Sequence, residues 1–192
     1  MGEMAMALKK SDAPWTYEDL RALPDDGKRY EIIEGDLFEL PTPTLPHASA
    51  IMNLIMLAAP LIEALGGRIF TGPLDVFLRD ADVVEPDIVA VLPGSRAALA
   101  QRGIEGAPDF IVEVISPECR GHDELTKRTL YALAGVQEYW LVDPHARSLN
   151  ILTLDQDALH TYGTFAAEAM VRSPLLEATF PVASVFAGIE VA

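Results

Sequence analysis

The chain has 192 residues, half of them hydrophobic, and a formal net charge of −15 from 29 acidic and 14 basic residues. This composition excludes an intrinsically disordered protein, and the length allows one domain with a sizeable core. The negative charge argues against strong non-specific binding of nucleic acid, although a metal site could still neutralise carboxylates locally.

Cys119 is the only cysteine, so an intrachain disulfide is impossible and a reducing compartment is expected. The first twelve residues have their charges in the wrong order for a signal peptide. The longest apolar segment, 51–65, is too short and too polar to span a bilayer. We therefore expect a soluble cytoplasmic protein with no membrane partner.

Residues 1–13 are predicted to be a flexible tail before a single domain of residues 14–192. The first elements of the domain are a short helix capped by Thr16 and a hairpin that turns at Glu34-Gly35. A longer helix follows, with apolar residues at helical spacing. The predicted ranges are 17–22 for the first helix, 29–33 and 36–40 for the hairpin strands, and 47–65 for the long helix.

Strands dominate the rest of the chain, with one further helix from about Asp123 to Gly135. Residues 93–107 are predicted to be a loop, and the most apolar strand, 109–115, is expected at the centre of the sheet. The other predicted strands are 68–70, 74–78, 84–92, 137–142 and 149–154. This order predicts an α/β fold, an α+β mixed sheet with helices on both faces, preceded by the N-terminal helix and hairpin.

Two acidic residues stand beside or within apolar strands. Asp87 follows Pro86 and opens the apolar run 88–91, and Glu113 lies inside the run 110–115. A buried carboxylate is costly unless something compensates its charge, and a hard cation such as Mg²⁺ or Mn²⁺ is the expected compensation. The pattern predicts Asp87 and Glu113 as metal ligands.

Two further residues complete the predicted catalytic set. Lys127, one helical turn after Asp123, would orient the attacking water or offset charge in the transition state. Glu31, in the first hairpin, would supply a further carboxylate.

Each of these four residues also has a structural interpretation. Asp87 suits a turn after proline, and Glu113 suits an edge strand with one solvated face. Lys127 could be an exposed helix lysine, and Glu31 could pair with a basic neighbour across the hairpin.

Two other residues lie near these motifs. His47 is interpreted as a surface or capping residue, with a contact to the phosphate or metal shell as the alternative. Tyr131 is interpreted as a core residue or as one that borders the site.

An ordered series of motifs extends from about residue 17 to residue 176. It consists of Arg29-Tyr30-Glu31-Ile32-Ile33-Glu34-Gly35, Glu85-Pro86-Asp87-Ile88, 103–109, Val112-Glu113-Val114-Ile115-Ser116-Pro117, 123–127 and 131–144. The series resembles the PD-(D/E)xK nuclease superfamily and, within it, the Uma-two family of restriction-endonuclease-like proteins. The lysine that the superfamily places two residues after the acid is replaced by Ile115, and the branch's helical lysine corresponds to Lys127.

The resemblance implies a restriction-endonuclease-like fold and Mg²⁺-dependent cleavage of phosphodiester bonds in nucleic acid, with DNA as the first candidate. Asp87 and Glu113 would be the metal ligands. A homodimer would suit the cutting of two strands. Two alternatives stay open: an interaction or regulatory protein that has kept the fold and lost the reaction, and a hydrolase of another phosphoester with a small active-site opening.

Overall fold

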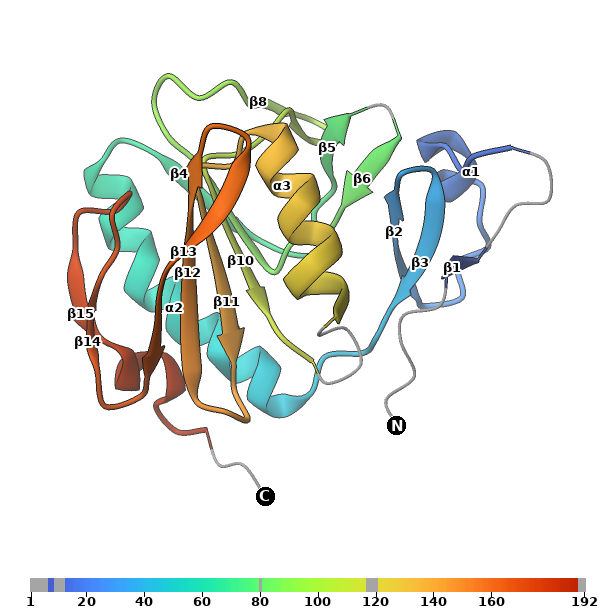
Figure 1. Cartoon of the computed structure of the whole chain (residues 1–192). Coiled ribbons are helices and arrows are strands. Elements are labelled where there is room, and N and C mark those ends of the chain that lie inside the picture. Colours follow the sequence, from blue (N-terminus) through green and yellow to red (C-terminus); the bar gives the residue numbers. More distant parts are fainter. Residues whose placement is uncertain (1–6, 9–12, 80, 117–120, 190–192) are drawn as a thin grey trace.

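The computed structural model describes residues 7–8, 13–79, 81–116 and 121–189 (Figure 1). Most of the predicted N-terminal tail, as well as Cys119, lies outside these residues. Within the tail, β1 (Ala7–Leu8) pairs antiparallel with β3 (Asp36–Leu40). The division into a tail and one domain stays a prediction.

The fold is mixed α/β, as predicted, but the expectation of a single mixed sheet was wrong. A seven-stranded sheet has the order β1, β3, β2 (Arg29–Ile33), β6 (Asp82–Val84), β5 (Val76–Arg79), β9 (Gly103–Glu105) and β8 (Ala98–Ala100). A six-stranded sheet has the order β13 (Ala158–Ala166), β12 (Ser148–Asp155), β11 (Glu138–Asp143), β10 (Phe110–Val114), β7 (Ile88–Val91) and β4 (Arg68–Thr71). A small sheet pairs β14 (Met170–Arg172) with β15 (Thr179–Pro181).

Both larger sheets are mixed because each contains one parallel pair. These pairs are β5 with β9 in the first sheet and β10 with β11 in the second. The predicted central position of the most apolar strand is confirmed, since β10 lies between β11 and β7 and all five of its residues are buried. β12 and β13 extend this sheet by antiparallel pairing.

The predicted strand 84–92 is two strands, and this division separates the sheets. β6 ends at Val84 in the seven-stranded sheet, and β7 begins at Ile88 in the six-stranded sheet. Pro86, between them, has no N–H to donate to a ladder, so the strand cannot continue through it. The chain therefore crosses from one sheet to the other immediately before Asp87. The predicted loop 93–107 also contains two short strands, β8 and β9.

The N-terminal helix and hairpin are confirmed. In α1 (Tyr17–Arg21) the Thr16 hydroxyl accepts a hydrogen bond from the Asp19 amide, and the Asp19 carboxylate accepts one from the Thr16 amide. Such reciprocal capping satisfies amides at the helix start that otherwise have no partner. β2 and β3 turn at Glu34 and Gly35, both with positive φ, as a tight two-residue hairpin requires.

Two core clusters lie on opposite faces of the six-stranded sheet, because successive strand residues point to opposite sides. Ile88 and Ala90 belong to the first cluster, whereas Val89 and Val91 belong to the second. α2 (Leu45–Ala64) contributes Ala50, Leu54 and Ile62 to the first cluster, and α3 (Arg128–Ala134) contributes Leu130, Tyr131 and Ala132 to the second. In the described part of the chain, α2 alone is long and apolar enough to cross a membrane by length and composition, although four of its residues are buried in the protein.

The second predicted helix begins as a π-helix. This segment, η1 (His122–Lys127), leads directly into α3. π-Helical turns are rare and are often found at functional sites. Asp123 and Lys127 are both buried on this turn.

Glu138 supplies a buried carboxylate away from the cavity described below. It accepts hydrogen bonds from Trp140 Nε1 at 2.7 Å, Ser173 Oγ at 2.6 Å and the Leu175 amide at 2.8 Å. Replacing Glu138 with Ala leaves two buried donors and one part-buried donor without this acceptor and is expected to lower the free energy of unfolding by about 3 kcal/mol. Urea denaturation of the purified variant checks this, and a loss below about 1 kcal/mol contradicts it.

Candidate metal and catalytic site

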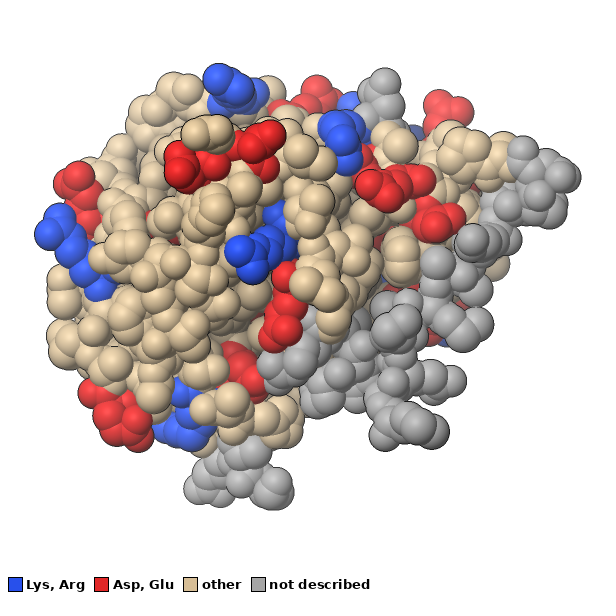
Figure 2. Space-filling view, viewed as in Figure 1, with Lys and Arg blue, Asp and Glu red and all other residues tan. Residues whose placement is uncertain are grey.

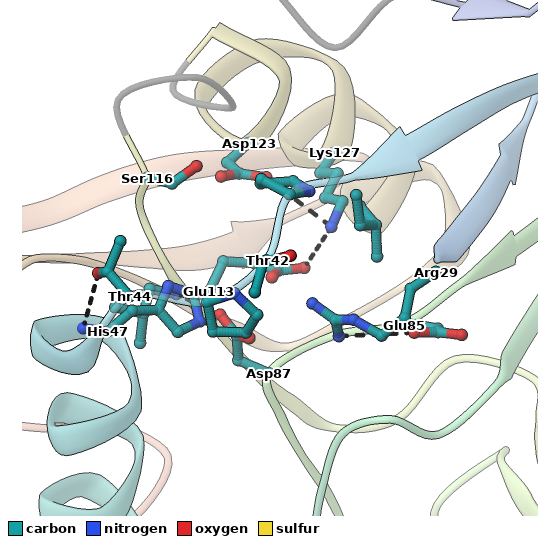
Figure 3. Close-up of a pocket in the computed structure, with 14 residues that line it drawn as sticks. Arg29, Thr42, Thr44, His47, Glu85, Asp87, Glu113, Ser116, Asp123 and Lys127 are labelled. Carbon is teal, nitrogen blue, oxygen red and sulfur yellow. Dashed lines mark hydrogen bonds and ion pairs between the residues drawn. The ribbon is translucent and has the colours of Figure 1, made fainter. Parts of the chain in front are cut away.

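A cavity of about 210 Å³ lies between elements of the two larger sheets (Figure 3). The segment 40–44 forms one wall, and η1 forms another. Figure 3 shows Thr44 and His47 at one end, Arg29 and Glu85 at the other, and Asp87 and Glu113 between them. The cavity therefore collects polar side chains from parts of the chain that are far apart in sequence.

Asp87 and Glu113 reach the cavity from adjacent strands. β7 and β10 are antiparallel with Ile88 opposite Val112, so the next residues along, Asp87 and Glu113, stand opposite each other. Asp87 Oδ2 accepts a hydrogen bond from the Val114 amide at 2.8 Å, which ties the residue to β10. Its other oxygen, Oδ1, lies 3.0 Å from His47 Nε2, at the start of α2. Both predicted metal ligands thus line one cavity.

Lys127 provides a buried cation beside these carboxylates. Its Nζ lies 2.8 Å from Glu31 Oε1, 2.9 Å from Glu113 Oε1 and 3.8 Å from Asp123 Oδ1. The interpretation of Lys127 as an exposed helix lysine is therefore wrong. The lysine lies in the middle of an acidic cluster formed by Glu31, Glu113 and Asp123.

Glu31 is fully buried and contacts the cluster from β2. Besides Lys127, its Oε1 accepts a hydrogen bond from the Glu85 amide at 2.8 Å. Its Oε2 lies 3.8 Å from His122 Nε2, which is too long for a hydrogen bond, and neither atom has another partner in the described part of the chain. Pairing of Glu31 with a basic hairpin neighbour is not observed: Arg29 is paired with Glu85 and Lys28 with Glu39.

The charges of this cluster are unevenly shared. Burial raises the pKa of Glu31, but attraction to Lys127 and the polar contacts with Lys127, His122 and the Glu85 amide together outweigh burial and lower the pKa to about 2. Burial raises the pKa of Glu113 well above its ordinary value, and attraction to Lys127 offsets this only in part. Burial lowers the pKa of Lys127, but Glu113, Glu31 and Asp123 together hold it well above its ordinary value. Lys127 therefore stays charged and Glu31 neutralises it, while burial disfavours the charged form of Glu113.

Glu113 also has a partner that holds its orientation. The Tyr131 hydroxyl donates to Glu113 Oε1 at 2.7 Å, from α3. Burial, followed by the nearby Glu113 charge, raises the pKa of Tyr131 well above its ordinary value, so the hydroxyl remains a donor. Tyr131 is thus both a core residue and a neighbour of the site.

The donor set suits a hard divalent cation. Mg²⁺ is commonly bound by one or two carboxylates, with water and substrate oxygens completing the shell. Asp87 and Glu113 supply two such carboxylates, and a cation bound there would favour the charged form of Glu113. Among the described residues, no three His, Cys, Asp or Glu side chains are arranged to hold a metal by themselves. Of the described residues, Asp87 and Glu113 are the two that would hold a metal.

Two carboxyl groups make the metal-free stability depend on pH. Burial raises the pKa of Glu85 to about 7 and that of Asp123 to about 6. The folded state therefore binds more protons than the unfolded state between their unfolded pKa values near 4 and pH 7, and the free energy of unfolding falls as pH rises through this window. In EDTA, we expect a higher urea midpoint at pH 5.5 than at pH 8. Glu85→Gln should reduce the difference, and a midpoint that rises with pH would contradict the assignment.

Sequence reasoning brought together the four candidate residues but missed several neighbours. The surface position favoured for His47 is wrong, because its side chain is 12% exposed and its ring contacts Asp87, which agrees with the alternative that it lies at the site. Glu85 and Arg29 form an ion pair with Nη1 and Oε2 separated by 3.6 Å, and both line the cavity. The available signal for His47 was its place directly after the Pro-rich segment that enters α2.

The same site residues fall within a match to a family of known proteins. The sequence model of the family Uma2, described as "Putative restriction endonuclease", matches residues 17–184. The chain belongs to the Uma2 family. The predicted resemblance to Uma-two proteins is confirmed, and the matched range includes all four predicted catalytic residues.

A solved structure supports the same fold for this Uma2 chain. A crystal structure from Anabaena variabilis ATCC 29413, described as a "putative nuclease belonging to DUF820", has a TM-score of 0.71 and 24% sequence identity to this chain. The likeness covers 90% of this chain and 98% of the other. A search of curated proteins found no match.

Proposed function

We propose that this Uma2 protein is a metal-dependent endonuclease that hydrolyses phosphodiester bonds of nucleic acid, with DNA as the first candidate. The observation that carries the proposal is the meeting of Asp87, Glu113 and Lys127 at one cavity. The proposal takes the six-stranded sheet, with α2 and α3 on its two faces, as a restriction-endonuclease-like core.

Each residue has a stated task in this proposal. Asp87 and Glu113 would hold Mg²⁺ or Mn²⁺, which lowers the pKa of bound water and neutralises charge on a phosphate oxygen. Lys127 orients the attacking water and offsets negative charge that develops on the phosphate. Glu31 holds the Lys127 ammonium in place and keeps it charged through their 2.8 Å contact.

The test is a cleavage assay on supercoiled plasmid, linear duplex, single-stranded DNA and RNA, with Mg²⁺ or Mn²⁺ against EDTA. We expect cleavage of at least one substrate only when metal is added. If all four substrates survive and calorimetry detects no Mn²⁺ binding at millimolar concentration, the chain is an interaction or regulatory protein with a nuclease fold.

We also propose a homodimer formed through α2. Leu45, Met52 and Met56 are 81%, 60% and 71% exposed on this helix, which has no Lys, Arg, Asp or Glu before Glu63. Two copies that each carry a charge of −15 repel each other least where they meet through an uncharged face. Sedimentation should give a dimer mass that Met56→Glu converts to a monomer mass. A wild-type monomer at tens of micromolar contradicts the proposal.

A further inference from the structure

A second hollow adjoins the candidate site. It has a volume of about 230 Å³, and we call it the tyrosine pocket because Tyr17 and Tyr30 line it. Arg29 and Glu85 line both this pocket and the catalytic cavity, so the two hollows share that ion pair as a common border. A nucleic-acid backbone that leaves the catalytic cavity past Arg29 would enter the tyrosine pocket next.

The two tyrosine rings are held in fixed positions and remain partly exposed. The Tyr17 hydroxyl donates to Asp75 Oδ2 at 3.0 Å, and the Tyr30 hydroxyl donates to Asp26 Oδ2 at 2.9 Å. Tyr17 also packs edge-on against Phe77, with ring centroids 4.7 Å apart. Rings anchored in this way lose little freedom when a flat group stacks on them.

The two hollows differ in the balance of positive and negative side chains that line them. The described residues of the catalytic cavity include two cations, Arg29 and Lys127, and four carboxylates, Glu85, Asp87, Glu113 and Asp123. In the tyrosine pocket three cations face two carboxylates, because Arg21 and Lys28 join Arg29 opposite Asp75 and Glu85. The cavity therefore suits a metal ion, and the tyrosine pocket suits a phosphate with an aromatic base.

The charge on the face shown in Figure 2 gives little support for a duplex bound there. On the face shown in Figure 2, the Lys and Arg side chains form separate patches rather than a continuous strip. Duplex binders neutralise many phosphates along such a strip. Each hollow is also smaller than a typical drug-sized site of roughly 300–1,000 Å³. Each therefore has room for about one nucleotide or less.

We propose that the substrate is an unpaired strand, which places its scissile phosphate in the catalytic cavity and a flanking nucleotide in the tyrosine pocket. A base within a duplex is stacked on both sides, whereas an unpaired base offers its face to an aromatic ring. Arg29 lies at the border and contacts the phosphate between the two nucleotides. This inference rests on the proposed nuclease function and specifies its substrate.

The experiment compares substrates that do and do not reach the tyrosine pocket. Cleavage of a labelled single-stranded 20-mer, as DNA and as RNA, is measured beside the matching duplex. Hydrolysis of bis(4-nitrophenyl) phosphate, a phosphodiester that contains no nucleotide, is measured with the same metal. Arg21→Ala and Tyr30→Ala remove one cation and one ring, and Tyr30→Phe keeps the ring. The matched controls, on exposed positions of other strands, are Arg172→Ala and Tyr162→Ala.

We expect the wild type to cleave the single strand at least tenfold faster than the duplex. Tyr30→Ala should lower kcat/KM for the single strand by about tenfold or more, the size of a lost base–aromatic stack, while Tyr30→Phe and both controls stay within about twofold. Hydrolysis of the small phosphodiester should be unchanged in Tyr30→Phe and in both controls, and far-UV circular dichroism shows that each variant is folded.

Other outcomes separate the two proposals. Equal or faster cleavage of the duplex, or unchanged single-strand cleavage by both Arg21→Ala and Tyr30→Ala, overturns the inference and leaves the nuclease intact. Hydrolysis of the small phosphodiester without cleavage of any 20-mer overturns it in favour of another phosphoester substrate. If the wild type hydrolyses nothing, the nuclease proposal fails. Fluorescence anisotropy with the single-stranded 20-mer then decides whether the tyrosine pocket still binds an unpaired strand.

Discussion

Replacing Glu113 with Gln is expected to lower metal-dependent cleavage by about a thousandfold or more, because a lost metal ligand removes several kcal/mol of transition-state stabilisation. The fold should survive the change. Burial raises the pKa of Glu113 well above its ordinary value, so an uncharged amide of the same shape is tolerated at this buried position. Gln also retains an oxygen that can accept from Lys127 and Tyr131.

The matched control for this variant is Glu138→Gln. Glu138 is a buried glutamate on the strand next to β10, opposite Phe110, and it does not line the cavity. Cleavage is measured as a progress curve on whichever substrate the wild type cuts, and Mn²⁺ affinity is measured by calorimetry. Full metal-dependent activity of Glu113→Gln would contradict the assignment of Glu113 as a metal ligand. An equal loss of activity in Glu138→Gln would point to a general structural effect.

Replacing Lys127 with Met is expected to lower the free energy of unfolding by about 3–5 kcal/mol at pH 8, since it leaves a buried charge unpaired. Glu31, fully buried, would keep the Glu85 amide as a donor but lose its cation. Activity should fall as well, by about 100-fold or more, if the ammonium offsets charge in the transition state. Urea denaturation and the cleavage assay measure the two effects separately.

The pH dependence identifies the cause of the lost stability. In the wild type the pKa of Glu31 is lowered to about 2, so its pairing contributes stability above its unfolded pKa near 4.5 and loses it as pH falls toward 2. Without Lys127, Glu31 is easier to bury protonated, and the loss should therefore be smaller at pH 4.5 than at pH 8. The double variant Lys127→Met with Glu31→Gln should regain much of the stability but none of the activity. Equal stability of the single variant and the wild type would falsify the role of this pair.

Short sequence patterns predicted correctly the features that depend on residues close together in the chain. The capping of α1 by Thr16, the turn at Glu34-Gly35 and the apolar strand β10 all follow from a few adjacent residues. The pairing of Glu113 with a cation was also accessible, since a carboxylate in an apolar strand requires compensation.

The features that were missed depend on contacts between distant segments. No pattern within residues 84–92 indicates that the two halves of this segment join different sheets, although Pro86 marks the point where the predicted strand divides. The contact of His47 with Asp87 joins residues 40 positions apart and depends on how α2 packs against the six-stranded sheet. The π-helical turn was invisible because its residues, His122–Lys127, fit an ordinary helix equally well by pattern.

The position of Lys127 on a helix has a consequence for recognising such proteins. The cation lies 14 residues from Glu113 along the chain, although their side chains meet at 2.9 Å. When acid and lysine share a strand, the alternation of side chains fixes their spacing at two residues, but a helix removes that constraint. A motif search that demands the lysine on the acid's own strand passes over this chain. Comparing the positions of charged atoms in space, regardless of the element that carries them, would retrieve it.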